Sequence, residues 1–243
     1  MCRVDSVSKN FLRVIERIHR AANSVGRDGD SVKLIVVTKG HPIDVVSAAI
    51  EAGASDLGEN YVEEASPKIF EHPSGPALSW HMIGHVQSRK AKAVSNQFDW
   101  VQTVDRMKLA RRLDRFAGEI NRKIPILLEC NVSGEETKYG WAAWNELGWQ
   151  ELCDEIAPVL EMENLIPHGL MTMAPYFDQP EEARPYFQRL RKLRDYCAEH
   201  FPEHDWHELS MGMSGDFEVA VQEGATMVRI GTAILGKRQN RKG

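Results

Sequence analysis

The sequence predicts a (β/α)8 barrel, and three observations support this fold class. Eight apolar, β-type segments recur along the 243 residues, and a segment with helical spacing separates each from the next. Alternation of strands and helices implies a parallel sheet. Eight such units in about 250 residues match a closed barrel. The competing open, doubly wound sheet has less support, because no G-x-G-x-x-G follows the first strand.

The first half of the chain reads as a helix followed by strand–helix units. Apolar residues recur at helical spacing from residue 4 to about residue 23. The continuous apolar run at 32–39 is typical of a strand buried on both faces. Pro42 and Gly53 mark the start and the end of the next helix. The further strands expected in this half are 56–59, 79–83 and 98–103, and the helices are 61–70, 87–95 and 106–121.

The second half repeats the alternation without a break. The expected strands are 125–132, 165–173, 205–210 and 227–230, and the expected helices are 144–161, 180–200 and 216–223. No linker or low-complexity segment interrupts the pattern. We therefore expect residues 1–243 to form a single barrel domain, with the first helix as an extra N-terminal piece.

Composition restricts the class of protein. The hydrophobic content of 42% and the charged content of 27% are ordinary for a soluble globular protein. A net charge of −5 argues against nucleic-acid binding, and the basic run 237–242 is interpreted as a solvated terminus. No apolar run approaches the ~20 residues that span a bilayer, and no signal peptide is seen. Cys2, Cys130, Cys153 and Cys197 form no C-x-x-C pair, so reduced thiols and a cytoplasmic location are expected.

Polar residues directly follow several apolar runs, which is where a barrel of this class places its site. Lys39 ends the first strand. A lysine held at the barrel mouth loses solvation, which favours its neutral amine, and a neutral amine can condense with an aldehyde. The alternative is an ordinary solvated lysine at a strand end, and for Lys39 taken alone it is the safer interpretation.

The last two strands are followed by residues suited to a phosphate. Gly231 and Thr232 form the turn after the last strand, where backbone amides can approach an anion, and Ser214 precedes the helix after strand 205–210. Arg229 ends the last strand and is either a structural ion-pair partner or a donor to a ring nitrogen. With Lys39 for the aldehyde, these residues indicate pyridoxal 5′-phosphate (PLP) as the candidate cofactor.

Seven segments spread in order over the chain carry a resemblance to a known family. They are 37–39, 58–62, 80–84, Gln87, Lys90, 209–214 and 227–234. The chain resembles the YggS/PROSC family of PLP-binding homeostasis proteins, whose fold is a barrel like the N-terminal domain of alanine racemase. The family is regarded as a carrier or regulator of PLP in vitamin B6 and amino-acid homeostasis.

The resemblance implies roles for individual residues. Lys39 would carry PLP as a Schiff base, Ser214, Gly231 and Thr232 would hold its phosphate, and Arg229 would face the ring nitrogen. The resemblance also implies that the pocket wall contains Asn60, His81, Ile83 and Met171. His85 and Arg89 depart from the family pattern in the loop 84–90, which leaves any partner contact there open.

Two other function classes remain as alternatives. A PLP-dependent racemase needs acid/base groups on both faces of the α-carbon. The sequence ends about ten residues after the phosphate turn, which leaves no room for the C-terminal domain that supplies the second base in alanine racemases. A metal site at His200, His204 and His207 is disfavoured because H-E-x-x-H is not met. We therefore expect a monomeric PLP carrier, with PLP-dependent apo-enzymes as candidate recipients and no metal or membrane partner.

Overall fold

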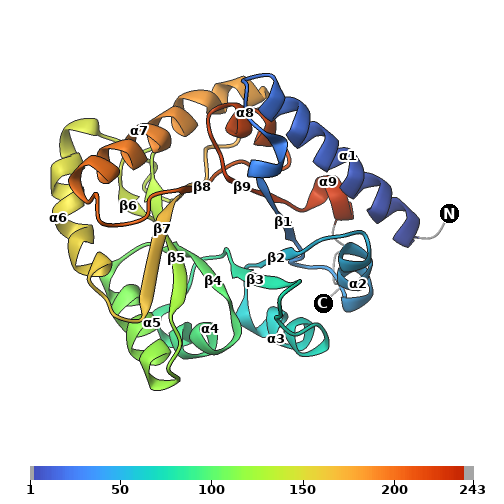
Figure 1. Cartoon of the computed structure of the whole chain (residues 1–243), viewed down its shortest axis with the longest axis horizontal. Helices are drawn as coiled ribbons and strands as arrows, with labels where there is room; N and C mark the ends of the chain where they lie inside the picture. Colours follow the sequence, from blue (N-terminus) through green and yellow to red (C-terminus); the bar gives the residue numbers. More distant parts are fainter. Residues whose placement is uncertain (1–2, 238–243) are drawn as a thin grey trace.

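The computed structural model describes residues 3–237 and confirms the predicted (β/α)8 fold (Figure 1). The strands are β1 (Lys33–Val37), β2 (Asp56–Glu59), β3 (Ser79–Met82), β4 (Trp100–Val104), β5 (Ile124–Asn131), β6 (Trp141–Ala142), β7 (Leu165–Met171), β8 (Glu208–Ser210) and β9 (Met227–Ile230). All strands but β6 follow one another around the barrel in chain order and pair in parallel. The ring closes where β9 pairs with β1 and β4 with β5.

Helices surround the barrel on the outside (Figure 1). They are α1 (Arg3–Asn23), α2 (Ile43–Glu51), α3 (Val62–Glu71), α4 (Ala91–Gln97), α5 (Met107–Glu119), α6 (Trp149–Leu160), α7 (Arg184–His200), α8 (Phe217–Gln222) and α9 (Thr232–Leu235). Short 3-10 turns at Gly29–Ser31, Ser88–Lys90, Glu146–Gly148 and Pro180–Ala183 precede β1, α4, α6 and α7. The extra helix α1 packs against α2, α8 and α9.

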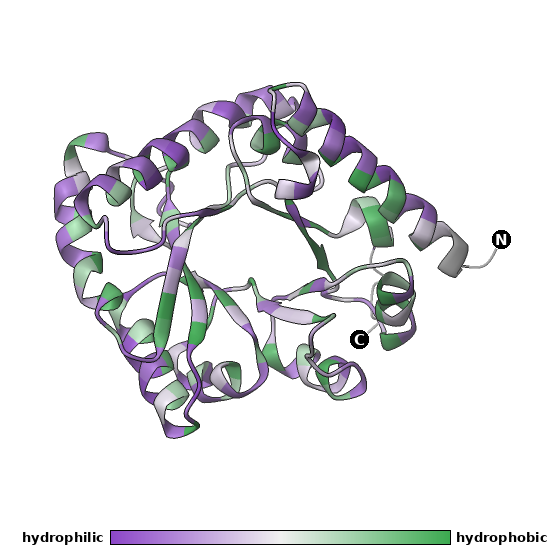
Figure 2. Cartoon of the chain, viewed as in Figure 1, coloured by the Kyte–Doolittle hydropathy of each residue, from purple (hydrophilic) through white to green (hydrophobic). Residues whose placement is uncertain are grey.

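The core has two parts, as the alternation of side chains in a closed barrel requires. The larger part lies between the strands and the helices and includes Trp80, Phe187 and Phe217, all fully buried. A smaller cluster lies inside the barrel and consists of Ile35, Leu127, Met171 and Met227. Figure 2 shows hydrophobic residues along β1, and hydrophobic and hydrophilic residues together on the helices.

The structure differs from the predicted elements mainly at their ends. The helix expected from residue 144 begins at Trp149, and the helix expected from residue 87 begins at Ala91, because a 3-10 turn comes first in each case. The strand expected from residue 98 begins at Trp100, since the Phe98 amide still caps α4 by bonding to Val94. The two helices thus begin five and four residues later than expected, whereas the two-residue difference at Trp100 is of the size usual where helices and strands fray.

The two-residue strand β6 was not predicted. It pairs with β5 outside the barrel ring, with Trp141 beside Cys130 and Ala142 beside Asn131. The Trp141 indole anchors it by donating from Nε1 to the Val104 carbonyl at 3.0 Å. A strand of this length has no periodicity that a sequence could reveal.

Two features noted in the sequence, Cys2 and the basic run beyond residue 237, lie outside the described residues. Cys130, Cys153 and Cys197 are buried and form no disulfide. Within residues 3–237, no helix combines the length and the apolar character needed to cross a membrane.

Candidate functional site

A cavity of about 290 Å³ opens at the barrel mouth, by which we mean the end of the barrel formed by the carboxyl ends of its strands. Loops after β1, β2, β3, β7, β8 and β9 surround it. Of the predicted site residues, the cavity is lined by Lys39, Asn60, Ile83, Ser214, Arg229, Gly231 and Thr232. Seven residues from the ends of five different strands or the loops after them thus meet at one place, as the barrel topology predicts.

The loops after β8 and β9 meet at one side of the cavity. The amide of Ala233 donates to Ser214 Oγ at 3.4 Å, so the predicted serine and the predicted Gly-Thr turn are in contact. Gly231 precedes α9, and a Cβ on it would lie 3.0 Å from the Val37 carbonyl oxygen. This distance is tighter than an ordinary Cβ contact, so a glycine suits the close approach of the two backbones. The first amides of a helix have no intrahelical partner, so this corner is suited to an anion.

Arg229 lies between the cavity and the barrel interior. Its side chain is buried, with Nη1 donating to Ser210 Oγ at 2.6 Å and Nη2 donating to the Thr172 carbonyl at 2.8 Å. Burial lowers its pKa to about 10, while Glu129 and Asp216 act in the opposite direction. Within residues 3–237 its hydrogen bonds go to neutral oxygens rather than to a carboxylate. The guanidinium therefore stays protonated at neutral pH, and one side of it faces the cavity.

Lys39 lies in the turn after β1 and lines the cavity. The peptide groups on both sides of it are hydrogen-bonded to side chains of α3, one buried and one partly buried. The Thr38 carbonyl accepts from Lys68 Nζ at 2.9 Å, and the Gly40 amide donates to Glu64 Oε1. The backbone that carries the predicted amine is thus held from both ends.

Asn60 and Ile83 form part of the cavity wall, as the family resemblance implies. The Oδ1 atom of Asn60 is buried and has no hydrogen-bond partner among the described residues. A buried acceptor without a donor is costly, so this atom is a natural contact for a ligand that donates.

His81 and Met171, which were also expected in the wall, are not among the residues lining the cavity. Both are fully buried. Met171 belongs to the apolar cluster inside the barrel. His81 is hydrogen-bonded through Nε2 to Asp56 at 2.9 Å and through Nδ1 to Gln102 at 3.0 Å. Each of these positions faces inward along its strand, but deeper in the barrel than the mouth.

The sequence interpretation missed one wall of the cavity. The residues concerned come mainly from the loops after β7 and β8 and are Val37, His41, Met173, Tyr176, Phe177, Pro180, Ala183, Met213, Gly215 and Asp216. Asp216 accepts from the Met213 amide at 2.6 Å and so shapes the loop that presents Ser214. Burial raises the pKa of Asp216, and the bond from Met213 and the charge of Arg229 oppose this shift.

The two residues that depart from the family pattern lie in the loop between β3 and α4, away from the cavity wall. His85 stacks on Tyr139 with ring centroids 3.6 Å apart, and its Nδ1 lies 3.1 Å from Asp105 Oδ2. Arg89 donates from Nε to Gln87 Oε1 at 2.9 Å. Their contacts are with neighbouring loops rather than with the site.

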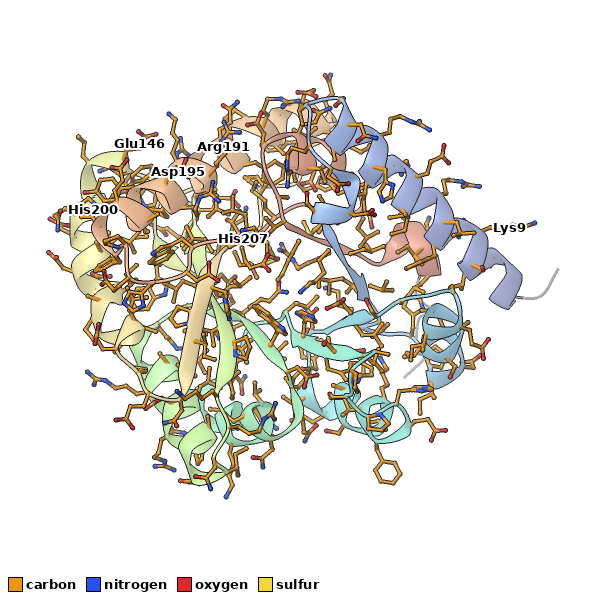
Figure 3. The ribbon with its side chains drawn as sticks, in the orientation of Figure 1. Lys9, Glu146, Arg191, Asp195, His200 and His207 are labelled. Carbon is orange, nitrogen blue, oxygen red and sulfur yellow. The ribbon has the colours of Figure 1, made fainter. Side chains whose placement is uncertain are left out.

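The three histidines considered as metal ligands make separate contacts. His200 lies at the end of α7 and His207 lies just before β8, and Figure 3 shows them well apart. His200 Nδ1 bonds to the Tyr196 carbonyl at 2.9 Å, and His204 lies 3.5 Å from Glu203. In the described part of the chain, no three side chains of His, Cys, Asp or Glu are grouped as metal ligands would be.

The chain matches the family model of the alanine racemase N-terminal domain over residues 13–239. Two curated relatives are named pyridoxal phosphate homeostasis protein. The protein of Vibrio alginolyticus is 36% identical over 238 residues, 97% of this chain and 99% of the relative. The protein of Aquifex aeolicus is 40% identical over 227 residues, 93% of this chain and 96% of the relative.

Solved structures show the same relationship. PipY of Synechococcus elongatus, solved with PLP bound, is 34% identical and aligns with a TM-score of 0.78 over 92% of this chain and 100% of PipY. An alanine racemase of Clostridium difficile is 14% identical and aligns with a TM-score of 0.70 over 95% of this chain and 56% of the racemase. At that level of identity the racemase shares the fold alone.

Proposed function

The chain belongs to the family of the alanine racemase N-terminal domain, and we propose that it binds PLP and serves in intracellular vitamin B6 and amino-acid homeostasis. The observation that carries the proposal is the cavity at the barrel mouth, where Lys39, Arg229 and the Ser214 corner face one space. The names of the relatives and the PLP bound to PipY support the same cofactor.

The side chains around the cavity fit PLP as a set. A phosphate suits the corner formed by Ser214, Gly231 and Thr232, and the orphaned Asn60 Oδ1 offers an acceptor on another wall. PLP supplies an aldehyde whose carbon can form a C=N bond to Lys39 Nζ, with the aldehyde oxygen leaving as water. Lys39 is the amine that lines the cavity among the described residues.

Arg229 favours holding the cofactor over using it as an electron sink. A guanidinium donates hydrogen bonds and accepts none, so opposite the ring nitrogen it would keep that nitrogen unprotonated. An unprotonated pyridine withdraws electrons less strongly, which disfavours carbanion chemistry. We therefore place Arg229 at the ring nitrogen as a cofactor-binding residue.

The curated relatives are named as homeostasis proteins rather than as enzymes. We propose that this chain is likewise a binding protein and that PLP-dependent apo-enzymes receive its cofactor. Racemisation would need a second acid/base group opposite Lys39. The tyrosine on the cavity wall is Tyr176, which is 87% exposed and has no hydrogen bond within residues 3–237 to orient its hydroxyl. A cytoplasmic location, a single barrel domain and a monomeric state belong to the same proposal.

Borohydride reduction tests the proposal directly. The purified protein is incubated with PLP, reduced, digested and mapped by mass spectrometry. We expect a phosphopyridoxyl adduct on the peptide that contains Lys39. In the Lys39→Ala variant we expect no adduct on the corresponding peptide. An adduct that persists in Lys39→Ala, or no adduct at excess PLP, would overturn the assignment. Incubation of the loaded protein with L-alanine tests the alternative, since D-alanine formed at a steady rate would indicate a racemase.

A further inference from the structure

A buried ionic cluster lies directly behind Lys39. Lys68 of α3 is 3% exposed, although lysine is among the residues least often buried. Its Nζ donates to Glu59 Oε1 at 2.6 Å, to Glu64 Oε1 at 2.9 Å and to the Thr38 carbonyl at 2.9 Å. An ammonium has three N–H groups, so every donor of Lys68 is used. Two of the three acceptors are carboxylates, and the third is the backbone next to Lys39.

The same cluster holds the backbone on both sides of Lys39. On the N-terminal side, the Thr38 carbonyl accepts a hydrogen bond from Lys68 Nζ, and the Thr38 hydroxyl donates to Glu59 Oε1 at 2.5 Å. On the C-terminal side, the Gly40 amide donates to Glu64 Oε1, which also accepts from Lys68. Gly40 has φ = 73°, a left-handed conformation that turns the chain back toward α3. The residue between these two anchors is Lys39.

The stability of the fold does not by itself explain why these charged side chains are buried. Taking a lysine and a glutamate out of water costs several kcal/mol per ion, and such a pair often stabilises a fold no better than apolar residues would. Glu59 is fully buried, its Oε2 has no partner among the described residues, and burial raises its pKa against the opposing effect of Lys68. Because burying these charges costs free energy next to the site, we look for their role in the residues that they position.

We propose that Lys68 and Glu64 are positioning residues for Lys39. They fix the peptides on both sides of it, so that its long side chain starts from a defined point and reaches the cavity in one direction. The proposal rests on the proposed function, because it assumes that Lys39 is the amine that captures PLP. Its physical effect is on the rate of covalent capture, since reactions between a fixed amine and a bound aldehyde depend steeply on orientation.

Glu64 is the residue to change, because its side chain is only partly buried at 25% exposed, and its loss leaves Glu59 and Lys68 paired. Glu64→Ala removes the acceptor for Gly40 and one acceptor for Lys68. Glu63→Ala is the matched control on the same helical turn, since Glu63 is 63% exposed and pairs with Lys90 instead. Glu64→Gln keeps an oxygen that can accept from the Gly40 amide and should restore most of the rate.

Two ligands separate positioning from general damage to the pocket. The rate of covalent capture is measured by adding borohydride at successive times after PLP is mixed with the protein and quantifying the adduct on Lys39. Pyridoxine 5′-phosphate has the same ring and phosphate but no aldehyde, so its affinity reports the pocket without Lys39 chemistry. For Glu64→Ala we expect capture to slow about tenfold with unchanged affinity for pyridoxine 5′-phosphate, since small misplacements of reacting groups have effects of this size or larger.

The outcomes are distinguishable. If the unmodified chain forms no adduct on Lys39, the proposed function fails, and the positioning role fails with it. If it forms the adduct, and Glu64→Ala captures PLP as fast as Glu63→Ala does, only the positioning role is overturned. A parallel loss of affinity for pyridoxine 5′-phosphate would also overturn it, because the cluster would then support the pocket as a whole. Selective slowing that Glu64→Gln reverses supports the proposal.

Discussion

Gln102 donates a hydrogen bond from Nε2 to Nδ1 of His81 at 3.0 Å, and this contact determines which imidazole nitrogen carries the proton. The direction of the bond follows from Arg229, which can only donate hydrogen bonds and donates one to Ser210 Oγ at 2.6 Å. Ser210 then donates to Gln102 Oε1 at 2.7 Å, which turns the amide nitrogen of Gln102 toward His81.

The chain of hydrogen bonds continues to the other end of the barrel. With Nδ1 as an acceptor, His81 must carry its proton on Nε2, which faces Asp56 Oδ1 at 2.9 Å. A single direction of donation thus runs from the cation at the cavity to a carboxylate deep in the barrel. His81, expected from the family resemblance to be in the cavity wall, instead contributes to holding Arg229 through two intermediate side chains.

We predict that His81 is neutral and protonated on Nε2 over the physiological pH range. Burial lowers its pKa, and the contact with Asp56 only partly offsets this. Nitrogen-15 NMR of the imidazole distinguishes the two tautomers and the imidazolium. In Gln102→Glu a carboxylate oxygen would face Nδ1 and favour the imidazolium, so the pKa of His81 should rise. Gln150→Glu, at an exposed position of α6, should leave the His81 signals unchanged. If Gln150→Glu shifts them as much as Gln102→Glu does, the hydrogen bond from Gln102 does not control His81.

Replacing Arg229 by Gln should weaken PLP binding by about tenfold or more, because a buried, charge-assisted hydrogen bond contributes roughly 1.5–3 kcal/mol. The absorbance of the bound cofactor should change as well, since the ring nitrogen loses its cationic neighbour. Equilibrium titration and the visible spectrum measure the two effects. Arg122→Gln is the control, as Arg122 bonds to the Ser95 and Phe98 carbonyls, lies 3.8 Å from Asp99 Oδ1 and does not line the cavity. Equal behaviour of the two variants would argue against the placement of Arg229.

Glu129 should make the protein less stable as the pH rises. Its side chain is buried on β5, and burial, together with the charge of Asp105, raises its pKa to about 7 against the opposing effects of Arg229 and Arg106. The unfolded chain has a glutamate pKa near ~4.3. Between these two values the folded protein binds more protons than the unfolded one, so stability is lost as the pH rises through this window.

The size of this effect is at most about 4 kcal/mol, because the two pKa values differ by roughly 2.7 units and each unit is worth 1.36 kcal/mol. Urea unfolding of the PLP-free protein at pH 5 and pH 8 measures it as the difference between the original chain and Glu129→Gln. The variant should lose less stability over this interval, because its amide does not ionise. Identical pH profiles for the two proteins would show that Glu129 is already ionised at pH 5.

The barrel was predictable from the sequence because its strands are nearly continuous apolar runs that end in polar residues. Lys39 and Arg229 lie near the ends of such runs, so the closed topology alone brings them to one cavity. The loop 174–179 lies between the expected strand and the expected helix, has no periodicity of its own, and takes its place over the cavity by tertiary packing. Phe177 could therefore be identified as a pocket residue only from the structure.

The position of His81 in the barrel depends on a different kind of information. Strand parity correctly predicts that it points into the barrel, as does Ile83 two residues later. The alternation of side chains along a strand does not say how deep in the barrel a given side chain lies. The partners of His81, Asp56 and Gln102, lie 25 and 21 residues away in the sequence. The hydrogen bonds that hold His81 inside the barrel therefore could not be predicted from the local sequence pattern.

Gly84 should tolerate no side chain, and the reason lies in how two loops of the mouth touch. A Cβ at Gly84 would lie 2.4 Å from the Asn60 carbonyl oxygen and 2.5 Å from the Asn60 Cα, both backbone atoms that cannot rotate away. Gly84→Ala must therefore push the loop after β3 from the loop that presents Asn60. We expect a loss of about 2–3 kcal/mol in unfolding free energy, typical of overpacking, with weaker PLP binding in the protein that remains folded. Gly75→Ala is the control because no heavy atom lies within 4 Å of its Cβ position. If the two variants unfold at the same urea concentration, the contact between Gly84 and Asn60 does not constrain the mouth.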